Sequence, residues 1–216
     1  MKRRENAGHE LDEEMKPYLQ PHPLVVVISG LSGVGKDVVL KGMREQGYIF
    51  HRVVTVTTRS PRPGEVEGVD YRFVSEDQYE AMMERGELLE HAVVYGRRYG
   101  VPEREIREPL ERGRDAVLRI DVQGAKTIKE KMPQAVLIFL TASSMEELKR
   151  RLIGRGKDSP EEMERRMNRA REEMGYLPKF DYLVVNRDGR LDDAVRQVMA
   201  IVTAEKHRVS RLSIRA

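Results

Sequence analysis

A glycine-rich segment near the start of the chain carries the spacing G-x-x-x-x-G-K, which runs from Gly30 to Lys36. Glycines let a backbone curl until successive N–H groups point inward, and such a curl binds anionic oxygens. The lysine adds a mobile cation, and a helix that begins here would direct its positive end at the same place. The segment therefore predicts a phosphate-binding loop. The residues expected to contact the phosphates of a bound nucleotide are Gly30, Ser32, Gly33, Val34, Gly35 and Lys36.

Asp37 departs from the usual pattern of such loops, in which a Ser or Thr follows the lysine and its hydroxyl binds Mg²⁺. We hypothesise that Asp37 still serves the metal, because carboxylate oxygens suit a hard cation. Its negative charge beside phosphates needs that cation to be tolerable. The alternative reading of the segment is a glycine-rich turn between a strand and a helix that binds no ligand.

A second group of polar residues lies in T-T-R-S-P-R-P-G-E, where Arg59 and Arg62 are three residues apart in a loop stiffened by prolines. Guanidinium groups bind phosphate oxygens in a forked geometry, so the two arginines suit a phosphate that is not on the glycine loop. Tyr71 could donate its hydroxyl to the same phosphate. The alternatives are a solvated basic turn and a tyrosine that belongs to the core.

The elements that must position these residues alternate between strands and helices along the chain. The apolar, mostly β-branched run before the glycine loop indicates a buried parallel strand. We also expect a strand over residues 52–59 and a turn over residues 96–102. Ser159 and Glu162 form a capping-box pattern that predicts a helix over residues 160–174. The alternation predicts an α/β fold with a largely parallel sheet.

The composition of the 216-residue chain indicates one domain, or one domain with insertions. A net charge of +3 is small beside 39 basic and 36 acidic side chains, so the charge does not demand a nucleic-acid partner. The absence of cysteine excludes disulfides and thiolate chemistry. The sequence has no apolar run of membrane-spanning length and no signal-peptide pattern, so we expect a cytoplasmic protein that does not bind membranes. Residues 1–21 are expected to form a flexible N-terminal extension.

Several motifs in a fixed order resemble the guanylate kinase family. They are the glycine loop, T-V-T-T-R-S-P-R-P-G-E-V-E-G-V-D-Y-R-F-V, L-L-E-H-A-V-V-Y-G-R-R-Y-G-V-P, L-R-I-D-V-Q-G-A, R-L-I-G-R-G and F-D-Y-L-V-V-N. The resemblance runs from about Leu24 to the last helix. It implies the P-loop nucleoside monophosphate kinase fold, a largely parallel sheet flanked by helices, in a domain over residues 22–210. Within it, a base-binding insertion would span about 54–102 and a helical lid about 144–176.

The resemblance also implies an activity, the transfer of the γ-phosphoryl group of ATP to GMP or dGMP with Mg²⁺, giving ADP and the diphosphate. Carried over position by position, the GMP-binding residues would be Thr55, Arg59, Arg62, Tyr71, Glu90, Tyr99, Val101 and Asp121. Glu90 resembles the acid that reads guanine, because a carboxylate can accept both the ring N–H and the exocyclic amine. Asp121 resembles an acid near the acceptor and the metal. The resemblance assigns the glycine-loop residues named above, together with Asp37, to the binding of ATP. On the lid side, Arg151, Arg155, Arg166 and Asn186 resemble residues that contact ATP.

Among these residues, those expected to act in the phosphoryl transfer itself are Lys36, Arg59, Arg62, Arg155 and Arg166. Two positions depart from the family pattern. Val101 replaces a Ser or Thr that would contact the guanine carbonyl, so one base contact worth about 0.5–1.5 kcal/mol is lost or passes to another donor. Arg119 stands where an acid often precedes Asp121 by two residues, which puts the balance of cations there in doubt.

Two other functions compete with a guanylate kinase. One is a kinase of the same fold for a different nucleoside monophosphate or a sugar phosphate, which Val101 favours and Glu90 opposes. The other is a non-catalytic guanylate-kinase-like module that binds proteins, but such modules lose the loop lysine or the acceptor arginines, and this chain keeps Lys36, Arg59 and Arg62. The expected partners are ATP and GMP, with no nucleic acid, in a monomer or a homodimer.

Overall fold

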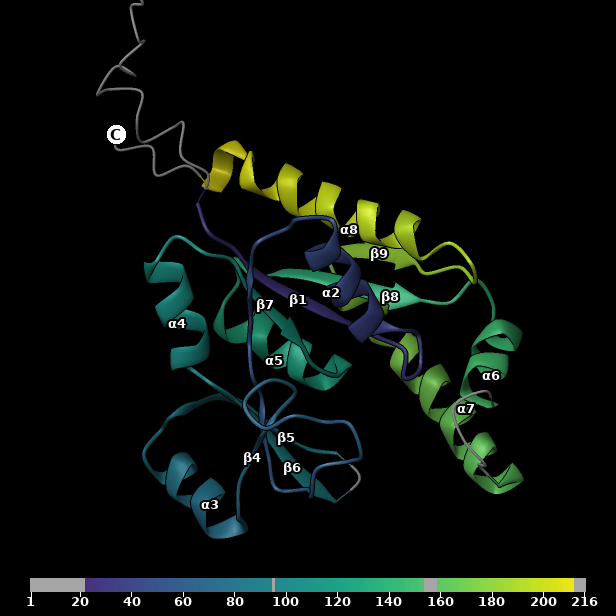
Figure 1. Cartoon of the computed structure of the whole chain (residues 1–216), viewed down its shortest axis with the longest axis horizontal. Helices are drawn as coiled ribbons and strands as arrows, with labels where there is room; N and C mark the ends of the chain where they lie inside the picture. The colour runs from purple at the N-terminus through teal and green to yellow at the C-terminus, as the bar shows by residue number, and fades with distance from the viewer. Residues whose placement is uncertain (1–21, 95, 154–158, 212–216) are drawn as a thin grey trace, which may run out of the picture.

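The structure is a computed structural model that describes residues 22–94, 96–153 and 159–211 (Figure 1). The predicted N-terminal extension over residues 1–21 and the predicted lid residue Arg155 lie outside the described residues.

A five-stranded parallel sheet forms the centre of the molecule, with strand order β2-β7-β1-β8-β9. Its strands are β1 (Val25–Gly30), β2 (His51–Arg52), β7 (Ala116–Arg119), β8 (Val136–Thr141) and β9 (Tyr182–Val185). Every residue of β1 is buried, as the apolar run predicted. Because successive side chains of a strand point to opposite faces, β1 contributes to a core on each side of the sheet.

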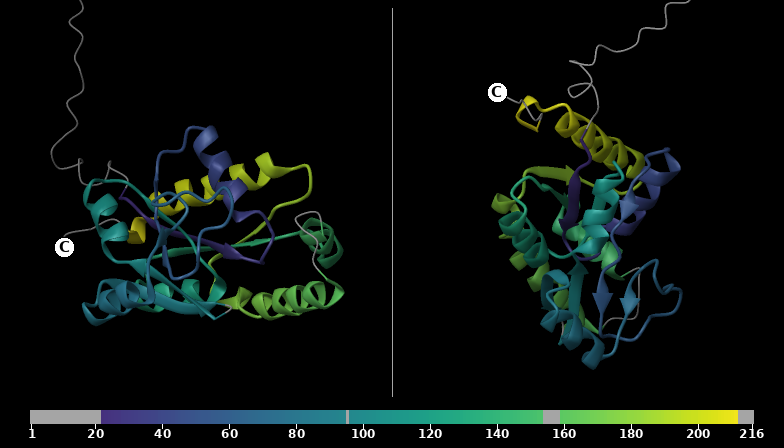
Figure 2. Two further views of the ribbon diagram at one scale, coloured as in Figure 1. Left: turned by 60° about the horizontal axis from the view of Figure 1, so that its bottom comes forward. Right: turned by 90° about the vertical axis from the view of Figure 1, so that its left-hand side faces the viewer.

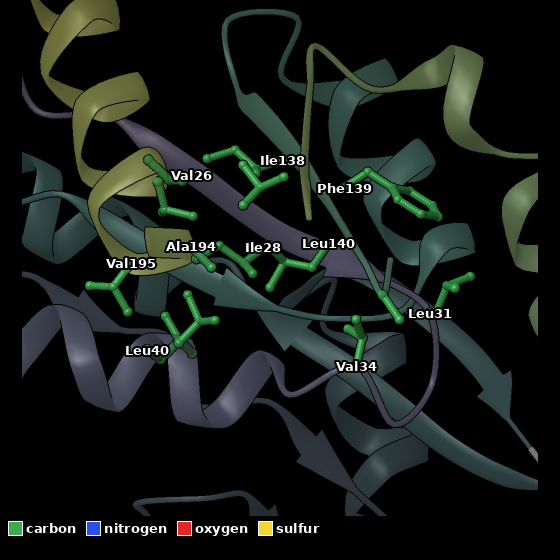
Figure 3. Close-up of a cluster of buried hydrophobic side chains, with 14 of the residues drawn as sticks. Val26, Ile28, Leu31, Val34, Leu40, Ile138, Phe139, Leu140, Ala194 and Val195 are labelled. Carbon is green, nitrogen blue, oxygen red and sulfur yellow. The ribbon is translucent and has the colours of Figure 1, made fainter. Parts of the chain in front are cut away.

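Helices cover both faces of this sheet. The helices on one face are α2 (Lys36–Glu45) and α8 (Leu191–Lys206), and those on the other are α4 (Arg104–Glu111) and α5 (Val122–Lys131). Val26 and Ile28 of β1 pack with Leu40 of α2 and Val195 of α8 in the larger core (Figure 3). Val25 and Val27 pack toward the second core. The main sheet is thus a layer between two layers of helices, as the α/β prediction required.

A second, four-stranded sheet lies in the region predicted as the base-binding insertion, with strand order β4-β3-β6-β5. Its elements are β3 (Val56–Thr57), β4 (Arg72–Phe73), α3 (Glu76–Glu84), β5 (Leu88–Val94) and β6 (Arg97–Pro102). The strand predicted over 52–59 is wrong in its extent, because the chain crosses there from β2 in the main sheet to β3 in the small one. The turn predicted over 96–102 is also wrong: these residues form β6, which pairs antiparallel with β5 and with β3.

Two helices connect β8 to β9, and they coincide with the predicted lid. They are α6 (Met145–Ile153) and α7 (Pro160–Met174), followed by the short helix η1 (Leu177–Lys179). The bounds of α7 match the prediction, since Ser159 and Glu162 form the expected capping box. The chain ends its described part with η2 (Val209–Arg211). In Figures 1 and 2 the small sheet and the α6–α7 pair both project from the body built on the main sheet. In the described ranges no helix is long and apolar enough to cross a bilayer.

Candidate active site

The glycine loop joins β1 to α2 at the carboxyl edge of the main sheet, where open α/β sheets bind their ligands. Gly30 ends β1 with φ +120°, and a Cβ there would lie 2.0 Å from the carbonyl oxygen of Leu140. Gly35 precedes the first helical residue with φ +95°. No other residue type fits these two positions without strain, so the glycines fix the path of the loop.

Lys36 folds its side chain back over the loop that carries it. Its Nζ donates hydrogen bonds to the carbonyl oxygens of Gly30 at 2.9 Å and Leu31 at 3.0 Å. Burial lowers the pKa of Lys36 to about 8, while the nearby carboxylate of Glu173 opposes that shift. An anionic phosphate beside this ammonium group would favour its charged form.

The carboxylate of Glu173, near the end of α7, reaches the same loop. Its Oε2 accepts a hydrogen bond from the backbone N–H of Ser32 at 2.8 Å, and its Oε1 accepts one from Arg169 Nε at 3.3 Å. Glu173 is buried, so this bond connects α7 to the glycine loop. Sequence reasoning missed both residues, because nothing in the charged pattern of α7 distinguishes them from a solvated face.

Arg151 and Asn186 support the loop from its other side. The amide of Asn186 donates to the carbonyl oxygen of Val34 at 2.9 Å, and Arg151 donates to the same oxygen at 3.2 Å. Arg151 also donates to the carbonyl oxygen of Asn186 at 2.7 Å and pairs with Glu147. Both predicted ATP-side residues therefore lie beside the loop, where their hydrogen bonds hold its backbone in shape.

Aromatic and guanidinium groups of the small sheet form a wall opposite the loop. Arg59 forms a two-pronged ion pair with Glu65, at 2.6 and 2.7 Å, and this pair holds the pKa of Glu65 at about 2. Arg59 Nε also donates to the hydroxyl of Tyr99 at 3.1 Å. Its guanidinium lies 4.8 Å from the centre of the Tyr71 ring, a cation–π contact. Arg59 is thus fixed behind the two tyrosines that face the loop.

Glu90 of β5 is a buried carboxylate at the base of this wall, only 3% exposed. Burial and, to a smaller extent, the charge of Asp121 raise its pKa to about 7. A Cβ on Gly124 would lie 3.0 Å from Glu90 Oε1, so that glycine leaves room beside the carboxylate. Among the described residues the Glu90 carboxylate accepts no hydrogen bond, so its oxygens can accept hydrogen bonds from a ligand.

Val101 lies beside this site but does not line its cavity. It pairs with Glu90 across the β5–β6 ladder and follows Tyr99 by two residues, and its side chain is fully buried in the second core with Val53 and Ile106. The fold thus brings Val101 next to Glu90, but a valine offers no hydrogen-bond donor there.

Asp121 and Arg119 lie at the end of β7, beside the loop. Asp121 begins α5 as its N-cap and accepts a hydrogen bond from the backbone N–H of Gly124 at 2.8 Å. Arg119 lies 2.9 Å from Asp37, and its guanidinium is 5.1 Å from the centre of the Tyr71 ring. Burial acts against the charge of Arg119, but Tyr71 and Asp37 outweigh it and raise the pKa of the guanidinium. Arg119 therefore stays charged.

One cavity joins the loop to the wall. Eight predicted site residues line it, namely Ser32, Lys36, Thr55, Arg62, Tyr71, Glu90, Tyr99 and Asp121. The lining residues that sequence reasoning did not assign are Ala92, Arg119, Ile120, Arg169 and Glu173. The predicted residues that do not line it are Gly30, Gly33, Val34, Gly35, Asp37, Arg59, Val101, Arg151, Arg166 and Asn186. The lysine of the loop and an arginine of the second cluster thus face the same space, as two opposed anions would require.

The fit of a magnesium ion differs between the two predicted ligands. Asp121 Oδ2 is buried and has no hydrogen-bond partner among the described residues, although the Arg169 guanidinium lies 3.8 Å away. An oxygen in that state fits a hard cation that takes its other ligands from phosphate and water. Asp37 fits less well, because Arg119 and Arg52 both contact its Oδ1, at 2.9 and 3.3 Å. Across the described ranges no three His, Cys, Asp or Glu side chains gather to hold a metal.

Comparison with known proteins identifies the family. The sequence profile described as guanylate kinase matches residues 22–205. Guanylate kinase 2, chloroplastic/mitochondrial, from Oryza sativa subsp. japonica is 46% identical over 195 residues, which cover 90% of this chain and 68% of the relative. Guanylate kinase from Thermus thermophilus is 46% identical over 186 residues, which cover 86% and 83%. The crystal structure of guanylate kinase from Anaplasma phagocytophilum superposes with a TM-score of 0.73 at 30% identity, covering 89% of this chain and 90% of that one. The chain therefore belongs to the guanylate kinase family and has the P-loop nucleoside monophosphate kinase fold that its motifs predicted.

Proposed function

We propose that this chain is an ATP:GMP phosphotransferase, which moves the γ-phosphoryl group of ATP to GMP or dGMP and releases ADP. The observation that carries the proposal is the shared cavity, in which Lys36 of the phosphate loop faces Arg62 and Tyr71 of the small sheet. In phosphoryl transfer, the protein has little covalent chemistry of its own to perform. Positioning and neutralisation of charge supply most of the rate, and this cavity offers both.

On the donor side, the loop from Gly30 to Lys36 holds the phosphates of ATP. The positive φ angles of Gly30, Gly33 and Gly35 curl the backbone so that N–H groups and the start of α2 face an anion. Lys36 lies beside them and adds the mobile charge. Arg151 and Asn186 act on ATP by keeping the loop in this shape. Ser32 must share its N–H with Glu173, whose carboxylate also anchors Arg169 near the cavity.

On the acceptor side, Arg62, Tyr71 and Tyr99 hold the phosphate of GMP, with Arg59 behind the two tyrosines. The ion pair of Arg59 with Glu65 fixes the guanidinium, so Arg59 either orients the tyrosine hydroxyls or turns one N–H toward the phosphate. The acceptor phosphate is itself the nucleophile and needs no strong base. Its alignment with the γ-phosphoryl group is therefore the main task of this wall.

Glu90 selects guanine. Its carboxylate can accept hydrogen bonds from the ring N–H and the exocyclic amine of guanine, and adenine does not offer that pair of donors. Thr55 lines the same part of the cavity and supplies a small hydroxyl group. Asp121 lies close enough to raise the pKa of Glu90, so it borders both the base and the acceptor. Val101 pairs with Glu90 in the ladder and has no polar side-chain atom, so we expect it to donate no hydrogen bond to the base.

A magnesium ion bound with ATP would neutralise negative charge on the phosphates. Asp121 is the residue best suited to hold it, through the oxygen that lacks a partner among the described residues. The hypothesis that Asp37 also serves the metal stays a prediction. It fails if Asp37→Ser leaves the Mg²⁺ dependence of turnover unaltered.

We expect two segments of the enzyme to move when the substrates bind. Residues of about 54–102 would form the base-binding insertion and those of about 144–176 the lid, which closes over ATP to exclude water. On closure we expect Arg166 and Arg155 to reach the phosphates. A pair of crystal structures, free and with both substrates, would contradict this part if neither segment moved toward the main sheet. The cytoplasmic location stays a prediction, since one relative is named for two organelles.

The test of the proposal is a coupled assay of ADP release from ATP with GMP, dGMP, AMP, UMP and CMP as acceptors. We expect turnover with the two guanine nucleotides and at most traces with the other three. Turnover that favours AMP or a pyrimidine would identify a kinase for another monophosphate. Absence of turnover together with absence of ATP binding by calorimetry would favour the protein-binding module.

A further inference from the structure

The two residues at which this chain departs most from the family pattern of charge contact one another. Asp37 stands where a Ser or Thr is usual, and Arg119 stands where an acid is often found. Their side chains meet in an ion pair of 2.9 Å between Arg119 Nε and Asp37 Oδ1. One departure adds a negative charge and the other replaces a negative charge with a positive one, so the new cation has the new anion as its partner. This suggests that the two positions act together.

Arg119 occupies the junction between the donor loop and the acceptor wall. Its side chain is 18% exposed, and what remains open lies in the cavity that Lys36, Tyr71 and Asp121 also line. Its guanidinium stacks on the Tyr71 ring from 5.1 Å, while Arg59 stacks on the same ring from 4.8 Å. A fixed cation at this junction faces the place where two phosphates must meet.

Asp37 holds Arg119 in that position from outside the cavity. It lies in the first turn of α2, its side chain is 62% exposed, and it does not line the cavity. Its Oδ1 contacts Arg119 and also Arg52, at 3.3 Å. Arg119 Nε makes no hydrogen bond among the described residues, so its contact with Asp37 is an ion pair only. The contact thus neutralises the guanidinium and keeps it near the first turn of α2.

We propose that Arg119 is a further catalytic residue, which donates hydrogen bonds to phosphate oxygens at the junction of donor and acceptor, and that Asp37 is its positioning residue. This inference rests on the proposed function. In the reaction, a GMP phosphate oxygen forms a bond to the γ-phosphorus as the bond to the β–γ bridging oxygen of ATP breaks, and ADP leaves with that electron pair. The guanidinium stabilises the negative charge that the transferred group carries in the transition state. An arginine in this role can account for much of the rate enhancement of a phosphoryl transfer.

Arg52 provides a matched control. It contacts the same oxygen of Asp37, its side chain is 16% exposed against 18% for Arg119, and it forms a second ion pair with Asp70 at 3.5 Å. It does not line the cavity. If the Asp37–Arg119 contact serves only to join α2 to β7, loss of either arginine should have a similar effect.

The experiment compares Arg119→Gln with Arg52→Gln. We expect Arg119→Gln to lower kcat about 10²- to 10³-fold while the Kd for GMP, measured by calorimetry without ATP, changes less than about 5-fold. Arg52→Gln should keep kcat within about 3-fold of the parent enzyme. Arg119→Lys should recover part of the loss, because it restores the charge without the fork.

A binding readout separates a catalytic role from a structural one. Fluoroaluminate with ADP and GMP mimics the flat, charged phosphoryl group in transfer. We expect Arg119→Gln to weaken that complex about as much as it lowers kcat, with melting temperatures of the two Gln variants within a few degrees. Equal kcat losses in the two variants, or an unchanged fluoroaluminate complex, would overturn the inference. If Arg119→Gln does not fold, the same comparison is made with Arg119→Lys, whose full kcat would overturn it.

Asp37 tests the pairing. We expect Asp37→Asn to lower kcat about 10-fold in the parent chain and less than 2-fold in the Arg119→Gln background, because a positioning residue matters only while Arg119 is present. Equal effects in both backgrounds would contradict the positioning role. These failures differ from failure of the proposed function, in which the parent chain itself releases no ADP with GMP.

Discussion

On the proposed function, the donor loop and the acceptor wall bind the same kind of group, a phosphate, yet the protein builds them in opposite ways. The loop is one continuous segment, and the groups it offers to a ligand are largely backbone N–H groups. Its glycines adopt positive φ angles in close contact with neighbouring atoms, and they fix the path of the backbone. The wall consists of side chains from different parts of the small sheet, held by the Arg59–Glu65 pair and by stacking on Tyr71. A site made of backbone groups depends on the conformation of one segment. A site made of side chains depends on the sheet that brings those side chains together.

The two halves also differ in how firmly they are supported. The loop lies on the large core shared by β1, α2 and α8. The small sheet rests on a cluster of four buried side chains, Val56, Tyr79, Met82 and Leu88. Burial of fewer apolar groups leaves less free energy to resist local opening. We therefore expect the acceptor half to be the more mobile one.

The largest effect should come from Lys36→Met, which removes the side-chain cation of the donor half. We expect kcat/KM to fall about 10³-fold in the ADP-release assay, because the cation lies where charge develops. Lys41→Met is the control, since Lys41 belongs to the same helix, is 76% exposed and pairs only with Glu45 among the contacts described. A similar loss in both variants would point to the helix rather than to the phosphate site.

Gly30→Ala should destabilise the donor loop by disturbing its backbone. The new Cβ would collide with the Leu140 carbonyl oxygen and also face the strain of positive φ, so we expect the free energy of unfolding to fall by roughly 3 kcal/mol. Gly47→Ala has a similar positive φ with no atom within 4 Å of its Cβ, and we expect a loss of about 1 kcal/mol. Urea unfolding measures both. Equal losses would mean that the close approach to β8 has no cost.

Glu90→Gln should impair the recognition of guanine in the acceptor half without affecting the donor loop. A glutamine can accept only one of the two guanine hydrogen bonds, and its own amine opposes the second donor. We expect kcat/KM with GMP to fall about 10²-fold while the trace activity with AMP is unchanged. Glu87→Gln, on an exposed side chain paired with Arg85, should change neither activity. If the preference for GMP over AMP survived in Glu90→Gln, another group would have to read the base.

The smallest effect is a pH dependence that belongs to the acceptor half. The folded-state pKa of Glu90 is raised to about 7, so below that pH GMP must displace a proton, and its affinity should fall by up to 10-fold per pH unit. The same shift stabilises the free protein below about pH 4.5, and that contribution is lost as the pH rises through 7. Calorimetry from pH 5.5 to 8 measures the affinity. The profile of Glu90→Gln corrects for titration of the GMP phosphate, and identical profiles for the two proteins would contradict the assignment.

The contrast between the two halves also explains what the sequence could predict. The donor loop and helix α7 follow from local patterns, the glycine spacing and the Ser159–Glu162 capping box, and the structure has both as expected. Strand β6 was missed because its glycines and proline are typical of a turn, and only pairing with β3 and β5 makes it a strand. Tertiary contacts override local preference in such segments.

Within the site, the sequence did not predict the roles of residues whose partners lie far away along the chain. Arg119 and Glu173 carry no local mark of function, because the first ends a strand and the second lies in a helix dense in charges. Their meaning comes from contacts with Asp37 and Ser32, which the fold alone brings near. Arg59 and Tyr71 were proposed from the residue types around the proline-stiffened loop, whereas Glu90 was found only through the resemblance to a family.

The most direct test of the whole account is a crystal structure with an analogue in which adenosine and guanosine are joined by a chain of five phosphates. The account predicts that the phosphates run from the loop beside Lys36 to Tyr71 and Arg62, with guanine within hydrogen-bond distance of Glu90. It would be contradicted if the guanine lay elsewhere, or if the chain of phosphates left the cavity between the loop and the wall empty.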